Sequence, residues 1–173
     1  MRNIQPENIQ EHSMQVAVLS HALAEISNTY YAENFDPGEL ALLALYHDVG
    51  EVIIGDLPTP VKYFNPQIKK AYGEIEDVAR QKLLSFLPVE LKSKYQPLLF
   101  PDESTKKYRL VKAADKISAY IKCLEECSAG NGEFILARQS IEKELATYSD
   151  MPAIGWFMDN CAESFTKTLD ELD

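Results

Sequence analysis

The chain has 173 residues, of which 46% are hydrophobic, and a formal net charge of −10. This length and composition predict one globular domain over residues 1–173 and exclude a disordered chain. The acidic charge argues against binding to a nucleic-acid polymer, whose phosphates are bound by clusters of Lys and Arg. It is compatible with a small phosphorylated substrate, because a bound metal reverses the sign of the local field.

We expect neither a membrane-spanning segment nor a secretion signal. No apolar run approaches the ~20 residues needed to span a bilayer, and no charged-then-apolar leader precedes the first predicted helix. The three cysteines, an odd number, predict reduced thiols and a cytoplasmic location. Cys123 and Cys127 lie four residues apart on a predicted helix, and Cys161 is alone. A thiolate metal site needs further sulfur or histidine ligands, so we interpret these residues as core cysteines.

The first predicted helix runs from about residue 12 to residue 28. Its apolar residues recur at helical spacing and form one buried stripe: Val16, Leu19, Leu23 and Ile26. His12 lies four residues before the stripe and extends it, so we expect this side chain to face inward. His21 is nine residues further on, about half a turn away at ~100° per residue, which predicts a surface position.

The second predicted helix delivers a histidine and an aspartate side by side near its end. Asp36 is a suitable N-cap, Pro37 fits the first helical position and Glu39 completes a capping box. The helix is predicted to run to about residue 49 and therefore to include His47-Asp48. If the helical turn continues, Glu51 shares a face with this pair. Residues 55–60 are predicted as a loop, because two prolines exclude a regular helix.

The rest of the chain is also predicted to be helical. A third helix begins at Asn65-Pro66, ends at Pro88 and carries the stripe Ile68, Tyr72, Ile75, Ala79, Leu83 and Phe86. Residues 88–101 are predicted as a connection with a short helical turn. A fourth helix covers about 104–128, with the stripe Leu110, Ala114, Ile117, Ile121 and Leu124. Two more cover about 133–148 and 152–172. The prediction is an all-α, single-domain bundle of about six main helices.

Four polar residues from three of these helices are predicted to point inward: His12, His47, Asp48 and Asp115. Helical bundles build metal sites from side chains that converge in this way. Two imidazoles and two carboxylates suit a mid-row divalent ion, and an ion with open positions provides a Lewis acid and an activated water. Each residue also has a plainer interpretation. Asp115 pairs with Lys112 on a helix surface, His12 caps a helix, and Glu51 is a solvated carboxylate.

The order His, His-Asp, Asp resembles the HD superfamily of metal-dependent phosphohydrolases. Three segments resemble more closely the bacterial HD-domain 5′-deoxynucleotidases: ENIQEHSMQVAVLSHALA, ALLALYHDVGEVIIGDLPTPVKYFN and VKAADKISAYIKCLEE. The resemblance covers nearly the whole chain, and GDLPTPVKYFN is its most specific part. It implies an HD-type domain that hydrolyses deoxyribonucleoside 5′-monophosphates to deoxynucleoside and phosphate.

The resemblance also implies roles for individual residues. The metal ligands would be His12, His47, Asp48 and Asp115, holding one divalent ion such as Co, Mn, Zn or Ni. Glu51 would lie by the attacking water as a catalytic residue. Asp56 would be catalytic as well, by assisting the leaving oxygen, or would hold the sugar 3′-hydroxyl. The nucleotide would contact His12, Asp48, Asp56, Leu57, Pro58, Thr59 and Asp115, in a homodimer.

Two alternatives stay open at this point. One is an HD hydrolase of another phosphorylated nucleotide, and the other is a helical module that binds metal or nucleotide without turnover. The presence of both Glu51 and Asp56 argues against the second alternative, because a pure binding module does not require a base beside its metal.

At its N-terminus this sequence differs from the family that it resembles. Family members usually carry an additional N-terminal helix, whose Arg-Trp pair contacts the phosphate and helps to exclude ribonucleotides. The sequence here begins with Met1-Arg2-Asn3, just after the position of that pair, and Trp156 lies far away in sequence. Either the sequence is truncated at its N-terminus, or the protein works without that pair, and both the phosphate contact and the preference for deoxyribose depend on which holds. Arg2 or Lys62 is a candidate for a replacement cation, although nothing in the sequence requires one.

Overall fold

The computed structural model describes residues 3–4, 6–55, 65–167 and 169–171, and within these ranges it contains helices and turns but no strand. The all-α prediction is therefore confirmed. The main helices are α1 (Ile9–Tyr31), α2 (Pro37–Tyr46), α3 (Glu51–Ile54), α5 (Pro66–Ser85), α6 (Val89–Leu99), α7 (Lys106–Ser128), α8 (Ile135–Leu145) and α9 (Pro152–Asn160). In the described part of the chain, no helix is long and apolar enough to cross a membrane.

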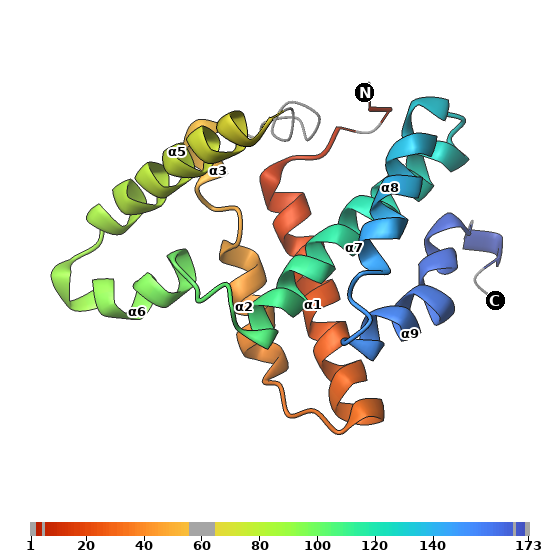
Figure 1. The fold of residues 1–173 in the computed structure, drawn as a ribbon, viewed down its shortest axis with the longest axis horizontal. Coiled ribbons are helices and arrows are strands. Elements are labelled where there is room, and N and C mark those ends of the chain that lie inside the picture. The colour runs from red at the N-terminus through yellow and green to blue at the C-terminus, as the bar shows by residue number, and fades with distance from the viewer. Residues whose placement is uncertain (1–2, 5, 56–64, 168, 172–173) are drawn as a thin grey trace.

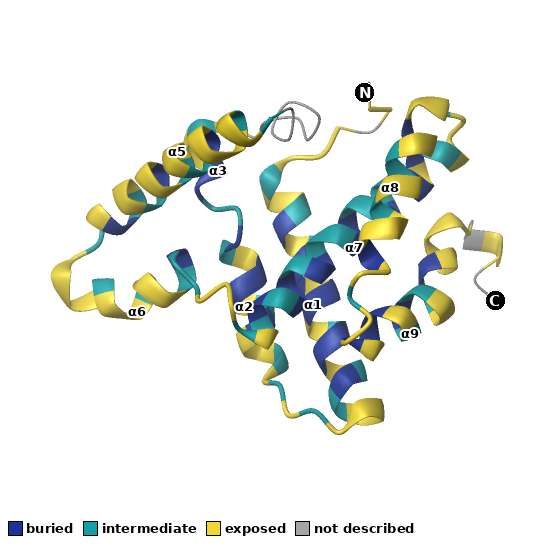
Figure 2. Ribbon diagram, in the orientation of Figure 1, coloured by how far each residue is buried: buried dark blue, intermediate teal, exposed yellow. Residues whose placement is uncertain are grey.

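Helices α1, α2 and α7 pack together in the middle of the molecule (Figure 1). Figure 2 shows buried residues on all three of these helices. The predicted stripe of α7 is buried throughout, and that of α1 is buried except for Ile26, which is only partly covered. Helix α8 packs against α7, and α9 packs against α1. This central packing fixes the positions of α1, α2 and α7 relative to one another.

Helix α1 begins three residues before the predicted start because of a capping box. The Asn8 side chain accepts hydrogen bonds from the backbone N–H groups of Gln10 and Glu11, and the Glu11 carboxylate accepts one from the Asn8 N–H. Such a reciprocal cap satisfies backbone donors that a helix start otherwise leaves unpaired. His12 consequently lies in the first turn of α1, with its ring facing the interior.

Helix α2 is shorter than predicted. It begins as expected, with Asp36 as N-cap and Pro37 in the first position, but it ends at Tyr46 with His47 as the C-cap residue. A turn over residues 47–50 follows, closed by a 2.9 Å hydrogen bond from the Glu51 N–H to the Asp48 carbonyl. Helix α3 then begins at Glu51, so this turn carries the His-Asp pair between two helices.

Helices α5 and α6 form an arm beside the central helices (Figure 1), joined to them through α3 and α2. The prediction of a mere connection at residues 88–101 was wrong, because α6 occupies Val89–Leu99 with Pro97 near its end, where a missing N–H disturbs little of the helix. The stripe predicted for α5 was partly wrong. Tyr72 and Ala79 are buried, but Ile75 and Phe86 are exposed, since α3 and α6 are the main helical neighbours of α5 among the described residues.

The C-terminal helix was predicted too long. Helix α9 ends at Asn160, and 3-10 turns η2 (Ala162–Thr166) and η3 (Leu169–Glu171) follow it. The Asn160 side chain donates a 2.7 Å hydrogen bond to the Trp156 carbonyl and so takes an acceptor that the helix would otherwise use. Competition of this kind is a common cause of helix ends at Asn.

Candidate active site

The four residues predicted as metal ligands meet at one point. His12 comes from α1, His47 and Asp48 from the turn after α2, and Asp115 from the middle of α7. Each offers one ligand atom, and these atoms all lie within 4.8 Å of one another. The Nε2 atoms of both rings face both carboxylates. His12 Nε2 lies 3.2 Å from Asp115 Oδ1, and His47 Nε2 lies 3.0 Å from Asp48 Oδ2.

The environment of His47 fits a metal ion. Its side chain is fully buried, and Nδ1 lies 2.7 Å from the Ala44 carbonyl oxygen, so Nδ1 carries the proton and donates. This leaves the Nε2 lone pair directed at the two carboxylates, and Nε2 is buried without a well-aligned hydrogen-bond partner. A buried polar atom without a partner is costly, and a cation would satisfy it. Two imidazoles with two carboxylates are a donor set that suits a divalent ion.

Two hydrogen bonds in series orient the ring of His12. Its Nδ1 lies 3.4 Å from the Ser118 hydroxyl, which in turn donates a 2.5 Å hydrogen bond to the Gln15 side-chain oxygen. Because Ser118 uses its proton on Gln15, it accepts from His12 Nδ1, and the ring then turns Nε2 toward Asp115. Neither partner was predicted from the sequence. Gln15 and Ser118 lie three residues after His12 and Asp115, one helical turn on, which is the spacing that could have revealed them.

Charge coupling within the cluster is strong. Burial alone lowers the pKa of His47, but hydrogen bonds and attraction from Asp115 and Asp48 outweigh burial and raise it to about 9. The pKa of His12 is raised for the same reason. Burial raises the pKa values of Asp115 and Asp48, but the neighbouring histidines outweigh it and hold both below their ordinary value. Without metal, the imidazoles therefore act as the counter-charges of the carboxylates.

Asp115 also forms the ion pair that the plainer interpretation expected. Its Oδ2 lies 3.2 Å from Lys112 Nζ, while its Oδ1 faces the two rings. The two interpretations of Asp115 therefore do not compete, because each uses a different oxygen.

Glu51 is a buried carboxylate next to this cluster in sequence. It is the first residue of α3, only 6% exposed, and its N–H is bonded to the Asp48 carbonyl. Acidic residues are seldom buried to this extent unless they are paired. The interpretation of Glu51 as a solvated carboxylate is therefore wrong. His21, in contrast, is exposed on α1, in agreement with its predicted surface position.

The predicted nucleotide loop, with Asp56, Leu57, Pro58 and Thr59, lies outside the described residues. The cation candidates Arg2 and Lys62 lie outside them as well. The residue before the loop, Gly55, has φ of +77°, a left-handed conformation that favours glycine. Its carbonyl accepts a 2.9 Å hydrogen bond from the Tyr72 hydroxyl on α5.

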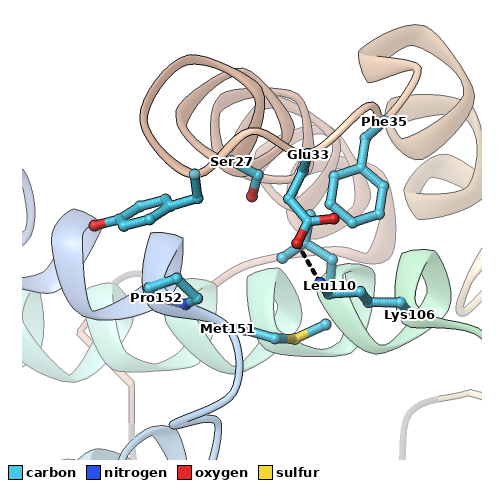
Figure 3. Close-up of a pocket in the computed structure, with 8 residues that line it drawn as sticks. Ser27, Glu33, Phe35, Lys106, Leu110, Met151 and Pro152 are labelled. Carbon is cyan, nitrogen blue, oxygen red and sulfur yellow. Dashed lines mark hydrogen bonds and ion pairs between the residues drawn. The ribbon is translucent and has the colours of Figure 1, made fainter.

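A small pocket at the other end of the central helices is not a competing site (Figure 3). It lies between the C-terminal part of α1, the start of α7 and the start of α9, and Glu33 and Lys106 form an ion pair across it. The rest of its lining is mainly apolar, with Phe35, Leu110 and Met151. It has no group of metal ligands, and its one carboxylate is already paired.

Known proteins resemble this chain over most of its length. The model of a family described as 5′-deoxynucleotidase YfbR-like matches residues 1–165. A 5′-deoxynucleotidase of Erwinia tasmaniensis is 49% identical over 173 residues, covering 99% of this chain and 87% of the relative. One of Cronobacter sakazakii is 50% identical over 99% of this chain and 86% of its own length.

A solved structure supports the fold independently. An HD-domain phosphohydrolase from Listeria innocua superposes with a TM-score of 0.84, covering 95% of this chain and 79% of that protein at 23% identity. This likeness confirms the predicted HD-type arrangement of helices.

Proposed function

Since this chain belongs to the YfbR-like 5′-deoxynucleotidase family, we propose that it hydrolyses deoxyribonucleoside 5′-monophosphates at a single divalent metal ion. The ion would be held by His12, His47, Asp48 and Asp115. The observation that carries this proposal is the cluster itself. Two imidazoles whose Nε2 atoms face two carboxylates, one of them buried and without a well-aligned partner, form a site built for a cation.

The mechanism assigns separate tasks to metal and protein. A divalent ion in this site would supply Lewis acidity and lower the pKa of water. Glu51 would act as general base and accept the proton of the attacking water, a role that suits a carboxylate shielded from solvent. The resulting hydroxide would attack phosphorus opposite the 5′ oxygen, which takes up the proton that water lost and leaves as the hydroxyl of the deoxynucleoside. A monoester needs no covalent intermediate with the protein.

Substrate positioning would be shared between the cluster and the loop after Gly55. His12, Asp48 and Asp115 would border the phosphate as well as hold the metal. Asp56 would hold the sugar 3′-hydroxyl or assist the departing oxygen. Leu57, Pro58 and Thr59 would contact the nucleotide, and proline would hold that segment in place at low entropic cost.

A substrate panel tests the proposed function. Phosphate release is measured after metal loading with deoxyribonucleoside monophosphates, ribonucleoside monophosphates, nucleoside diphosphates and pyrophosphorylated nucleotides. Preferred cleavage of the deoxyribonucleoside monophosphates is expected. Cleavage restricted to diphosphates or pyrophosphorylated nucleotides would show an HD hydrolase of different substrate class. Metal and nucleotide binding without any release would show a module without turnover.

We also propose that residues 1–173 form one domain and that the protein works as a homodimer in the cytoplasm. Support for one domain is a core cluster that joins residues of α1, α2, α7, α8 and α9. Support for the dimer is a set of large apolar side chains that the single chain leaves exposed, including Met14, Val18 and Val78. Support for the cytoplasm is that all three cysteines are free thiols.

A further inference from the structure

Helix α7 carries six basic residues, and one of them differs from the others in its partner. Each forms an ion pair with an acidic residue: Lys106 with Glu33, Lys107 with Glu39, Arg109 with Asp150, Lys112 with Asp115, Lys116 with Glu144, and Lys122 with Glu126. Only the partner of Lys112 belongs to the metal-ligand cluster. Lys112 is therefore the cation that α7 contributes to the active site.

The Lys112 side chain is partly exposed beside this cluster. Nζ lies 3.2 Å from Asp115 Oδ2, on the oxygen that faces away from the two rings, and the side chain is 38% exposed. The ammonium carries three donors, and the ion pair uses one of them. Among the described residues Nζ has no second ion pair, so two donors remain for a ligand that approaches the cluster from solvent.

The charge of the described site residues favours such a cation. Among them, Asp48, Asp115 and Glu51 supply three carboxylates, whereas a divalent ion supplies two positive charges and neutral histidines supply none. The incoming phosphate monoester carries about −1.5 to −2 near neutral pH, and the whole chain is acidic. A phosphate would therefore meet a site with excess negative charge unless Lys112 balanced it.

We propose that Lys112 is a phosphate-binding residue of this active site, donating from Nζ to a phosphate oxygen while it remains beside Asp115. This inference rests on the proposed function and adds the residue that receives the phosphate. It also supplies, from α7, a cation in addition to the two candidates named from the sequence, Arg2 and Lys62. Charge-assisted hydrogen bonds of this kind are about twice as strong as neutral ones.

The test compares two ligands that the enzyme does not hydrolyse. Inorganic phosphate and a deoxynucleoside are titrated calorimetrically into the metal-loaded full chain, for the wild type, Lys112→Met, Lys112→Arg and Lys107→Met. Lys107 is the matched control, because it is on the same helix, is 41% exposed and is paired with Glu39 outside the site. Bound metal per chain is measured for every variant by elemental analysis.

Lys112→Met should weaken phosphate binding about 10- to 100-fold, the loss expected for a charged hydrogen bond. Its deoxynucleoside affinity and metal content should stay unchanged. Lys112→Arg should keep most of the phosphate affinity, and Lys107→Met all of it. Unchanged phosphate affinity in Lys112→Met would overturn the inference. Parallel loss of metal and phosphate would overturn it too, by showing that Lys112 only positions Asp115. A wild type that binds metal but neither ligand would instead contradict the proposed function.

Discussion

Glu51 is the described residue on which the proposed chemistry depends most. Glu51→Gln keeps the size of the side chain but removes its ability to accept a proton at neutral pH. Turnover should fall by about 10²- to 10⁴-fold, the usual contribution of a general base, while metal content stays at the wild-type level. Steady-state phosphate release and elemental analysis on the same preparation give both values. If this variant turned over substrate at the wild-type rate, Glu51 would not be the general base.

Ser118 acts through His12 and not on the substrate. Ser118→Ala removes the acceptor for His12 Nδ1 and leaves the Gln15 side chain without its donor. Loss of such an outer partner of a metal ligand commonly weakens metal binding by about 10- to 100-fold. Competition with a chromogenic chelator measures the change, and turnover should recover at saturating metal. Ser104→Ala, which alters a hydroxyl outside the site, serves as control.

At the scale of elements, a hydrogen bond joins the arm to Gly55, the last described residue before the predicted nucleotide loop. Tyr72 on α5 donates to the carbonyl of Gly55, where α3 ends and the loop begins. Tyr72→Phe removes this bond and keeps the ring, so the structure loses about 1 kcal/mol at that point. The KM for a deoxyribonucleoside monophosphate should rise severalfold, with kcat and metal content little changed. An unchanged KM would show that the arm does not contribute to substrate binding.

The comparison of predicted and observed elements shows where local sequence signals suffice. The stripe of α7 was predicted correctly because Leu110, Ala114 and Ile121 are covered on one side by a continuous core. The stripe of α5 failed at Ile75 and Phe86, since apolar spacing does not reveal how many partners a helix has. The break after Tyr46 was missed because it depends on hydrogen bonds within the turn at residues 47–50 and not on a proline or a helix-ending glycine.

The site was predicted from side-chain chemistry more completely than the elements that carry it. Helical phase was enough to select His12 and set His21 aside, and both placements hold. The hydrogen bond from Ser118 to Gln15 was not predicted, because it joins residues 103 positions apart and depends on how α1 packs on α7. The position of Lys112 beside Asp115 was predicted from helical spacing, but its relation to the whole site required the fold.

At the scale of the whole molecule, assembly is open to direct measurement. A chain of 19.6 kDa should sediment as a species of about twice that mass if it is a homodimer. Val18→Glu and Val78→Glu place a charge on two separate exposed apolar positions, and one of them should shift the equilibrium toward monomer. A wild type that stays monomeric at high micromolar concentration would contradict the dimer.

The central claim is that His12, His47, Asp48 and Asp115 bind the metal on which hydrolysis depends. Elemental analysis of Asp115→Ala after metal loading tests it most directly, with Asp150→Ala as control, because Asp150 pairs with Arg109 away from the cluster. Circular dichroism verifies that both variants are folded. The expected result is loss of metal in Asp115→Ala and one ion per chain in the control and the wild type. A folded Asp115→Ala that keeps its full complement of metal would contradict the four-ligand site.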